Sequence, residues 1–188
     1  HAPFVVHVPL GRVSFYDFTS LFVVPYGVSV VFLGLGAWVY WARRRMRAGR
    51  GYLFFCSALV GASAGCLDMN ASHTLVRLWI AAVPATGVAL AHLALVFPDE
   101  VTWVRRWTNV RYLVWLPCLA AIALAEWQLY NPANPWAYIG TWLDNYLLVS
   151  VSTVIFFGLL AWRMRASSSA AVRQQCRVIL LGSLLAFA

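Results

Sequence analysis

Residues 78–97 decide the fold class of this chain: they read LWIAAVPATGVALAHLALVF and contain no Asp, Glu, Lys or Arg. A helix rises about 1.5 Å per residue, so a helix of this length crosses the hydrocarbon core of a bilayer, which is about 30 Å thick. Other apolar runs of roughly 16–23 residues occupy much of the chain. Together they predict an all-α, polytopic transmembrane helical bundle.

The composition agrees with a membrane protein. The 188 residues are 62% hydrophobic and 11% charged, and their mean hydropathy is +0.74. Soluble domains are nearer half apolar and a quarter charged. This composition excludes a soluble enzyme, a disordered tail and a disulfide scaffold.

The apolar runs predict five complete spans and a truncated sixth. The complete spans are expected at residues 19–41, 51–67, 78–97, 112–127 and 141–162. The sixth begins near Val178 and reaches Ala188 after 11 residues, whereas a complete span needs about 20. Residues 19–188 are therefore expected to form one transmembrane domain that is truncated at its C-terminal end.

Residues 1–18 come before the first expected span and contain two prolines and a glycine. Polar and apolar side chains alternate along them, which is typical of an extended or interfacial segment at the outer surface. Ser14 and Asp17 are three residues apart, the spacing at which a serine caps the start of a helix. We expect them to cap the helix that follows.

The arginines predict the orientation in the membrane. The chain has 14 arginines, no lysine and a formal net charge of +8, and only Arg12 and Arg77 lie outside three basic segments. Those segments are residues 43–50, 99–111 and 163–177. Cytoplasmic loops carry the excess of positive charge, so these segments are expected inside and the N-terminus outside.

The same arginines bear on location and partners. A basic set made only of arginine, in a chain rich in Ala, Gly, Leu, Val and Trp, suggests a GC-rich bacterial gene and hence the bacterial inner membrane. Because membrane topology accounts for the positive charge, no nucleic-acid partner is expected. The expected partners are the bilayer and other membrane helices, in a homodimer or a larger membrane assembly.

Polar residues near the expected outer ends of the spans form a candidate ligand- or proton-sensing patch. They are Asp68, Asn70, His73, Glu126 and Asp144. A histidine in such a patch titrates near neutral pH, as a pH sensor requires. Ordinary capping of the loop is the favoured alternative, and the spacing matches no metal site, so no metal is expected.

His92 is the one histidine inside an expected span, and a polar side chain at that depth is a functional candidate by default. Haem ligation would need a second histidine at similar depth. We therefore favour a structural hydrogen bond, with a signalling or cofactor role as alternatives. Ser57 is the partner best matched in depth, ahead of Ser152 and Thr153.

Gly61 and Gly65 have the spacing of small residues that let two membrane helices approach closely. Packing within the chain is the favoured interpretation, and a dimer interface is the alternative. The sequence has no phosphate-binding glycine loop, no HExxH, no nucleophile–base pair and no carboxylate dyad. We expect that this segment is not an enzyme by itself. No cofactor is predicted, and bound lipid is left open.

Two apolar motifs suggest a family. Residues 91–98 read AHLALVFP, which resembles the HxxLxFP helix end in the N-terminal membrane input domains of certain bacterial sensor histidine kinases. Residues 172–182 read VRQQCRVILLG and are similar to the start of a later helix in those domains, and Val8-Pro-Leu-Gly-Arg12 fits their opening. In that family a cytoplasmic kinase follows the membrane domain, and its motifs do not occur in this chain.

The resemblance implies a membrane-embedded signal-input module of a larger bacterial signalling protein, such as a histidine kinase. A sensor of this kind needs two helix packings whose balance an effector can change. The alternative is an accessory or scaffold subunit of a larger membrane complex, which binds lipid, pigment or neighbouring helices. A transporter is weaker, because the expected spans carry no charged side chain away from their outer ends and show no pair of broken helices in corresponding halves.

Overall fold

The computed structural model describes residues 14–187, except 70–71, 99, 101, 108, 130, 132 and 135. Within this described part every regular element is helical and no strand occurs, so the predicted all-α class is confirmed. The elements run in chain order as α1 (Phe15–Phe18), the π-helical turn η1 (Thr19–Val23), α2 (Val24–Arg43), α3 (Arg47–Met69), α4 (Val76–Val96), α5 (Thr102–Arg106), α6 (Val110–Leu113), α7 (Leu116–Gln128), α8 (Ala137–Ala166) and α9 (Ala170–Phe187).

The first long helix starts where the sequence places its cap. The backbone N–H of Asp17 donates to the Ser14 hydroxyl at 3.0 Å, and that hydroxyl donates to the Asp17 carboxylate at 2.7 Å. The predicted Ser14 cap is therefore confirmed, and it starts a continuous helix from Phe15 to Arg43. The helix thus begins four residues before the expected first span, and residues 1–13 of the expected outer segment lie outside the described residues.

Three described helices are long and apolar enough to cross a membrane. They are Phe15–Arg43 with 29 residues, Val76–Val96 with 21 and Ala137–Ala166 with 30. The expectation of five complete spans and a truncated sixth is not supported at this level of detail. Each of these three helices lies where a span was expected. The remaining expected spans differ from them in length or charge.

The other helices of the bundle are interrupted by turns or carry charged residues. A turn at Val114 and Trp115 separates α6 from α7, which leaves α7 with 13 residues and a length of about 20 Å. In α3, charged residues at both ends shorten the uncharged stretch to residues 51–67, about 25 Å long. The first half of α9 carries Arg173 and Arg177.

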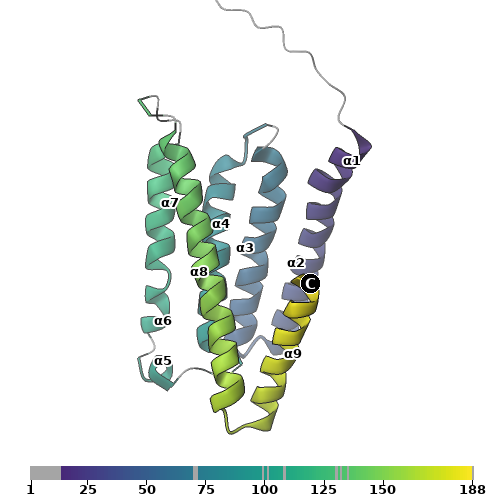
Figure 1. Cartoon of the computed structure of the whole chain (residues 1–188), viewed down its shortest axis with the longest axis vertical. Coiled ribbons are helices and arrows are strands. Elements are labelled where there is room, and N and C mark those ends of the chain that lie inside the picture. The colour runs from purple at the N-terminus through teal and green to yellow at the C-terminus, as the bar shows by residue number, and fades with distance from the viewer. Residues whose placement is uncertain are drawn as a thin grey trace, which may run out of the picture.

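The central element is α4, which packs between α3 and α8 (Figure 1). In the most apolar stretch of α4, 78% of the residues are buried, against 22% in α8 and 6% in the helix that contains α2. Small residues allow this close packing: a Cβ added at Gly87 would lie 2.8 Å from the Cα of Val149 on α8. Burial therefore identifies α4 as the core of the bundle.

Contacts also establish the directions of the helices. Gly61 and Gly65 of α3 face Ala82 and Trp79 of α4, in that order, so these two helices are antiparallel. Trp79 packs on Trp142 of α8 at a ring distance of 5.2 Å, and Gly87 meets Val149 two turns later, so α4 and α8 are parallel. Both run toward the same end of the bundle (Figure 1).

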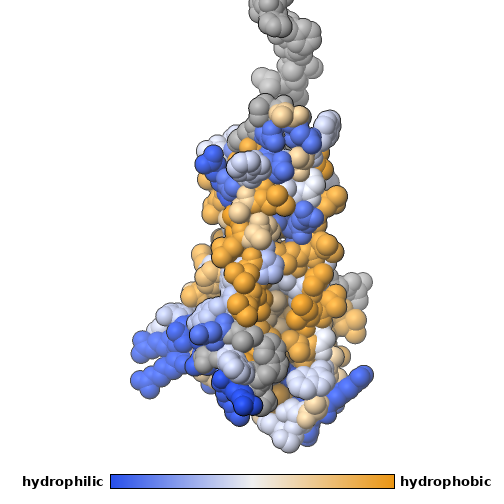
Figure 2. Space-filling view, turned by 90° about the vertical axis from the view of Figure 1, so that its left-hand side faces the viewer, coloured by the Kyte–Doolittle hydropathy of each residue, from blue (hydrophilic) through white to orange (hydrophobic). Residues whose placement is uncertain are grey.

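We call that end the arginine end, because it holds the α2–α3 turn, α5, α6 and the α8–α9 turn, drawn at the bottom of Figure 1. The space-filling view in Figure 2 shows a hydrophobic band between two hydrophilic ends. The predicted basic loops are partly helical, because α8 continues to Ala166 and α9 starts at Ala170.

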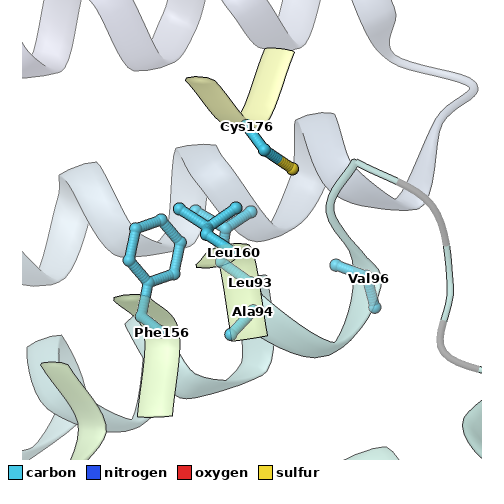
Figure 3. Close-up of a cluster of buried hydrophobic side chains, with 6 residues drawn as sticks. All are labelled: Leu93, Ala94, Val96, Phe156, Leu160 and Cys176. Atoms are coloured by element: carbon cyan, nitrogen blue, oxygen red, sulfur yellow. The ribbon is translucent and has the colours of Figure 1, made fainter. Parts of the chain in front are cut away.

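Near the arginine end, α9 joins the core through a cluster of buried side chains. Figure 3 draws its members, which are Leu93, Ala94 and Val96 of α4, Phe156 and Leu160 of α8, and Cys176 of α9. Cys176 is fully buried although it lies between two arginines in the sequence. This cluster attaches the last helix to the central one.

Candidate functional site

A cleft of about 490 Å³ opens at the arginine end, between α3, α4 and the α6–α7 segment. We call it the arginine cleft. Its lining combines basic, aromatic and small apolar residues: Arg47, Arg50, Gly51, Phe54, Ala89, His92, Val96, Arg111, Tyr112 and Trp115. Its volume lies within the range of sites that hold small molecules, about 300–1,000 Å³.

Two arginines of the cleft share one carboxylate. Glu100 accepts from Nη1 of Arg47 at 2.7 and 2.9 Å, and Nη1 of Arg111 lies 3.5 Å from the same carboxylate. The side chains of Glu100 and Arg111 are 16% and 13% exposed, so this cluster is more shielded than an ordinary surface ion pair. The three residues tie α3 to the connection between α4 and α7.

The start of α3 makes this part of the cleft favourable for an anion. Arg47 and Arg50 lie three residues apart in the first turn of α3, so both reach the same side of the helix. The helix dipole is positive at this end, which is unfavourable for two guanidinium groups by themselves. A bound anion relieves that repulsion, and Glu100 supplies it for Arg47.

The cleft also has an aromatic lining, which comes from α3 and from the α6–α7 segment. The guanidinium of Arg111 lies 4.8 Å from the ring centre of Tyr112, a cation–π arrangement. Phe54 and Trp115 meet edge to face at a ring distance of 5.0 Å, and both sit on the border of the cleft. The site therefore combines positive charge with an aromatic surface.

His92 points into this cleft and has a different partner from the one expected. Its Nδ1 accepts from the Nε1–H of Trp115 at 3.4 Å, and its ring also packs on Tyr112. The expected pairing with Ser57 is wrong, because Gly51 is the α3 residue beside His92. Ser57 comes six residues later, about 9 Å further along the helix, and it is exposed.

The expected outer patch contains a capping residue. The Asp68 carboxylate accepts from the Ser72 hydroxyl and, at 2.6 Å, from the backbone N–H of Leu75 at the start of α4. The hydrogen bond from the Ser72 hydroxyl, helped by those from the backbone, outweighs desolvation and lowers the pKa of Asp68, which lies beyond the apolar part of α3. His73 donates its backbone N–H to the Asp68 carbonyl at 2.9 Å and has a φ of 55°.

The other members of the expected patch lie on three different parts of the chain. Glu126 of α7 faces Arg77 of α4 at 3.7 Å, Asp144 is exposed on α8, and Asn70 lies outside the described residues. Among the residues that the structure describes, no three His, Cys, Asp or Glu side chains are placed to hold a metal ion.

Gly61 and Gly65 lie against α4 in the same chain. A Cβ at Gly61 would be 2.9 Å from the Cβ of Ala82, and one at Gly65 would be 2.8 Å from Cδ1 of Trp79. These contacts correspond to the favoured interpretation, packing within the chain. A dimer interface would need a different surface of the chain, because α4 already covers Gly61 and Gly65.

Sequence patterns did not identify the residues of the arginine cleft as a site. Membrane topology alone accounted for Arg47 and Arg111, and Glu100 was given no role. Arg47 and Glu100 are 53 residues apart, so no local pattern signals their pairing.

One arginine predicted in a basic loop is instead buried. Arg163 is 6% exposed on α8, and its Nη2 donates to the carbonyl of Leu95 at 3.3 Å. That carbonyl is in the last turn of α4, where backbone acceptors lack partners within the helix. A cation at a helix C-terminus is favourable, so Arg163 stabilises the end of α4 that borders the cleft.

The chemistry available at the arginine cleft is therefore recognition of a negatively charged group that carries an apolar portion. Guanidinium groups bind carboxylate and phosphate oxygens with charge-assisted hydrogen bonds, and the aromatic side accommodates an apolar body. Comparison of this chain with models of protein families, with curated proteins and with solved structures finds no match.

Proposed function

We propose that this chain is a membrane-embedded signal-input module that responds to a ligand at the arginine cleft. The observation that carries this proposal is the contact of Glu100 with both Arg47 and Arg111. Glu100 belongs to the connection that follows α4, the central helix, so loss of this contact would free a segment joined directly to the core. An effector that favours one of two packings is what a sensor requires.

The membrane arrangement is part of the proposal. The helices α2, α4 and α8 run in one direction, so α3 and the α6–α7 segment return the chain through the same layer (Figure 1). These return passes would make the protein multi-pass although their helices are shorter or more polar. The arginine end is then cytoplasmic and the N-terminus outside, in the bacterial inner membrane.

The input role rests on a structural change, which can be measured by electron paramagnetic resonance. Spin labels at Met46→Cys, in the α2–α3 turn, and Arg106→Cys, in α5, report the distance across the Glu100 contact. The chain, with its native cysteines replaced, is reconstituted in lipid nanodiscs. Glu100→Gln is expected to lengthen and broaden the distance distribution, because the charge pairing is lost.

Glu126→Gln is the matched control, since it removes a carboxylate that faces an arginine at the opposite end of the bundle. It should leave the distribution unchanged. If Glu100→Gln and the parent protein give the same distribution, the contact is not a movable element and the input role fails.

A scaffold subunit of a larger membrane complex is the second candidate. It is favoured by α2, where only Ser29 and Gly36 are buried and the remaining side chains are at least partly accessible. Native mass spectrometry of the protein extracted from its own membrane separates the two roles. A stable complex with other membrane subunits would favour the scaffold.

A further inference from the structure

We propose that the arginine cleft binds the headgroup of an anionic phospholipid, whose phosphate replaces the Glu100 carboxylate between Arg47 and Arg111. This inference rests on the proposed function and names its ligand class. In the structure Glu100 occupies the position of the ligand anion and acts as a competitor within the chain.

The charges in the cleft favour an anion that offers several acceptor oxygens to the three arginines. Arg47, Arg50 and Arg111 line the cleft, and among the described residues the carboxylate paired with them is that of Glu100, which contacts Arg47 and Arg111. Arg50 is exposed and lies one turn from Arg47 on the same helix. A phosphate can accept from several guanidinium groups at once, and the positive end of α3 adds to its stabilisation.

The shape of the cleft favours an amphiphile over a small free anion. Beyond the arginines its lining is mainly small apolar or aromatic, and consists of Gly51, Phe54, Ala89, His92, Val96, Tyr112 and Trp115. Phe54 is 54% exposed, so one apolar side chain of the cleft is also open to the surroundings of the bundle. Acyl chains can therefore leave the cleft past Phe54, while the phosphate stays at the arginines.

The position along the bundle also fits a headgroup. The cleft lies at the arginine end, beside the hydrophobic band that Figure 2 shows between the two hydrophilic ends. Phospholipid phosphates lie just outside the hydrocarbon core, and basic pockets between helices at the cytoplasmic surface bind anionic headgroups. The ligand thus reaches the site from the bilayer itself.

Lipid binding also explains why the Glu100 contact would respond to a ligand. Arg47 binds either the carboxylate or the phosphate, so headgroup binding releases the segment around Glu100 from α3. The coupling is reciprocal: if lipid binding weakens the Glu100 contact, the contact weakens lipid binding, so removal of the contact must strengthen lipid binding. This relation makes the proposal testable through Glu100 alone.

The experiment titrates the detergent-solubilised chain with three probes. Dioctanoyl-phosphatidylglycerol is the anionic lipid, dioctanoyl-phosphatidylcholine is the zwitterionic one, and inorganic phosphate is the free anion. Native mass spectrometry gives the dissociation constant for each lipid, and calorimetry gives it for phosphate. We expect phosphatidylglycerol to bind at least about tenfold more tightly than either of the other probes.

Variants of the cleft identify the site. Arg47→Gln and Arg111→Gln should each weaken phosphatidylglycerol binding by about tenfold or more, because each removes a charge-assisted hydrogen bond. Arg165→Gln is the matched control, since it removes an exposed arginine at the same end of the molecule but outside the cleft. Glu100→Gln should strengthen binding by about three- to tenfold, because the competing carboxylate is gone.

The outcomes separate the two proposals. Phosphate that binds as tightly as the lipid overturns the lipid assignment, and an equal effect of Arg165→Gln and Arg111→Gln overturns the cleft as the site. If Arg111→Gln prevents folding, Arg50→Gln is used in its place, because Arg50 is exposed. Unchanged or weaker binding to Glu100→Gln overturns the competition. Lipid binding as expected, with no change in the spin-label distances, leaves this inference standing and refutes the input role.

Discussion

Asp68 organises the turn between α3 and α4 through its carboxylate, which accepts from Ser72 and from the backbone of Leu75. These bonds stabilise the ionised form and lower the pKa of Asp68 in the folded protein. A lowered folded-state pKa contributes stability that is fully present above the ordinary value near 3.9 and is lost as pH falls through the lowered value. Asp68 therefore acts as a structural cap whose contribution disappears in acid.

Asp68→Asn is expected to lower the melting temperature in detergent at pH 7, because the amide is a weaker acceptor at the start of α4. The difference from the parent protein should shrink as pH falls below about 4, where the parent also loses the carboxylate. Thermal unfolding followed by circular dichroism at pH 7 and pH 3 measures it. A difference that stays constant with pH would contradict the assignment.

The hydrogen bond between His92 and Trp115 can be measured by a double-mutant cycle. His92→Phe, Trp115→Phe and the double variant should show a coupling of about 0.5–2 kcal/mol, the usual range for polar pairs between membrane helices. The matched cycle pairs His92→Phe with Ser57→Ala and should show no coupling, because Ser57 does not meet His92. Coupling to Ser57 instead would restore the sequence-based pairing.

At the scale of elements, the contact between α4 and α8 depends on the absence of a side chain. The backbone of Val149 lies so close to Gly87 that even a methyl group would have to move it. Pro84, three residues earlier, lies inside α4 and is fully buried, so the residue that lacks a backbone donor sits in the packed interior of the bundle. Neighbouring helices hold α4 in place there.

Gly87→Ala should destabilise the bundle by about 1–3 kcal/mol, the usual cost of overpacking. Gly34→Ala is the matched control on α2, because a Cβ at Gly34 meets nothing within 4 Å. The control should be neutral or stabilising by up to about 1 kcal/mol, since alanine favours helix more than glycine does. Unfolding by denaturant in detergent compares them, and an equal effect of both substitutions would contradict this account of the α4–α8 contact.

At the scale of the whole molecule, the two ends of the bundle differ in charge. The α2–α3 turn, α5, α6 and the α8–α9 turn bring the basic segments together at the arginine end (Figure 1). Residues far apart in the sequence thus contribute to one basic surface, which continues into the arginine cleft. This clustering is what the excess of positive charge on cytoplasmic loops predicts for a multi-pass protein.

The orientation can be tested with single cysteines in a background that lacks the four native ones. Met46→Cys lies in the turn after α2, and Asn134→Cys lies between α7 and α8 at the opposite end. An impermeant maleimide should label position 134 in intact cells. It should label position 46 only after the membrane has been permeabilised. Labelling of position 46 but not 134 in intact cells would reverse the topology.

Local patterns along the chain were enough to predict the helical class, the Ser14 cap and the basic segments. Each depends on residues that are close in sequence: an apolar run determines a long helix, and a serine three residues before an aspartate caps it. The lengths of the helices were predicted less well, because a turn at Val114 and Trp115 divides an apolar run that is continuous in the sequence. The number of spans was therefore predicted less well than their nature.

The arginine cleft was decided by the tertiary structure. Its ion pairs join Arg47 and Arg111 through Glu100. Its aromatic lining forms only when the turn between α6 and α7 brings Trp115 to Phe54 of α3 and His92 of α4. The partner of His92 likewise depended on the relative positions of two helices, which placed Gly51 rather than Ser57 beside it. Sequence alone determined which segments are helices, because helix formation follows local side-chain chemistry. Only the tertiary structure decided which side chains meet. Those contacts depend on the relative depth and rotation of helices that are distant in the chain.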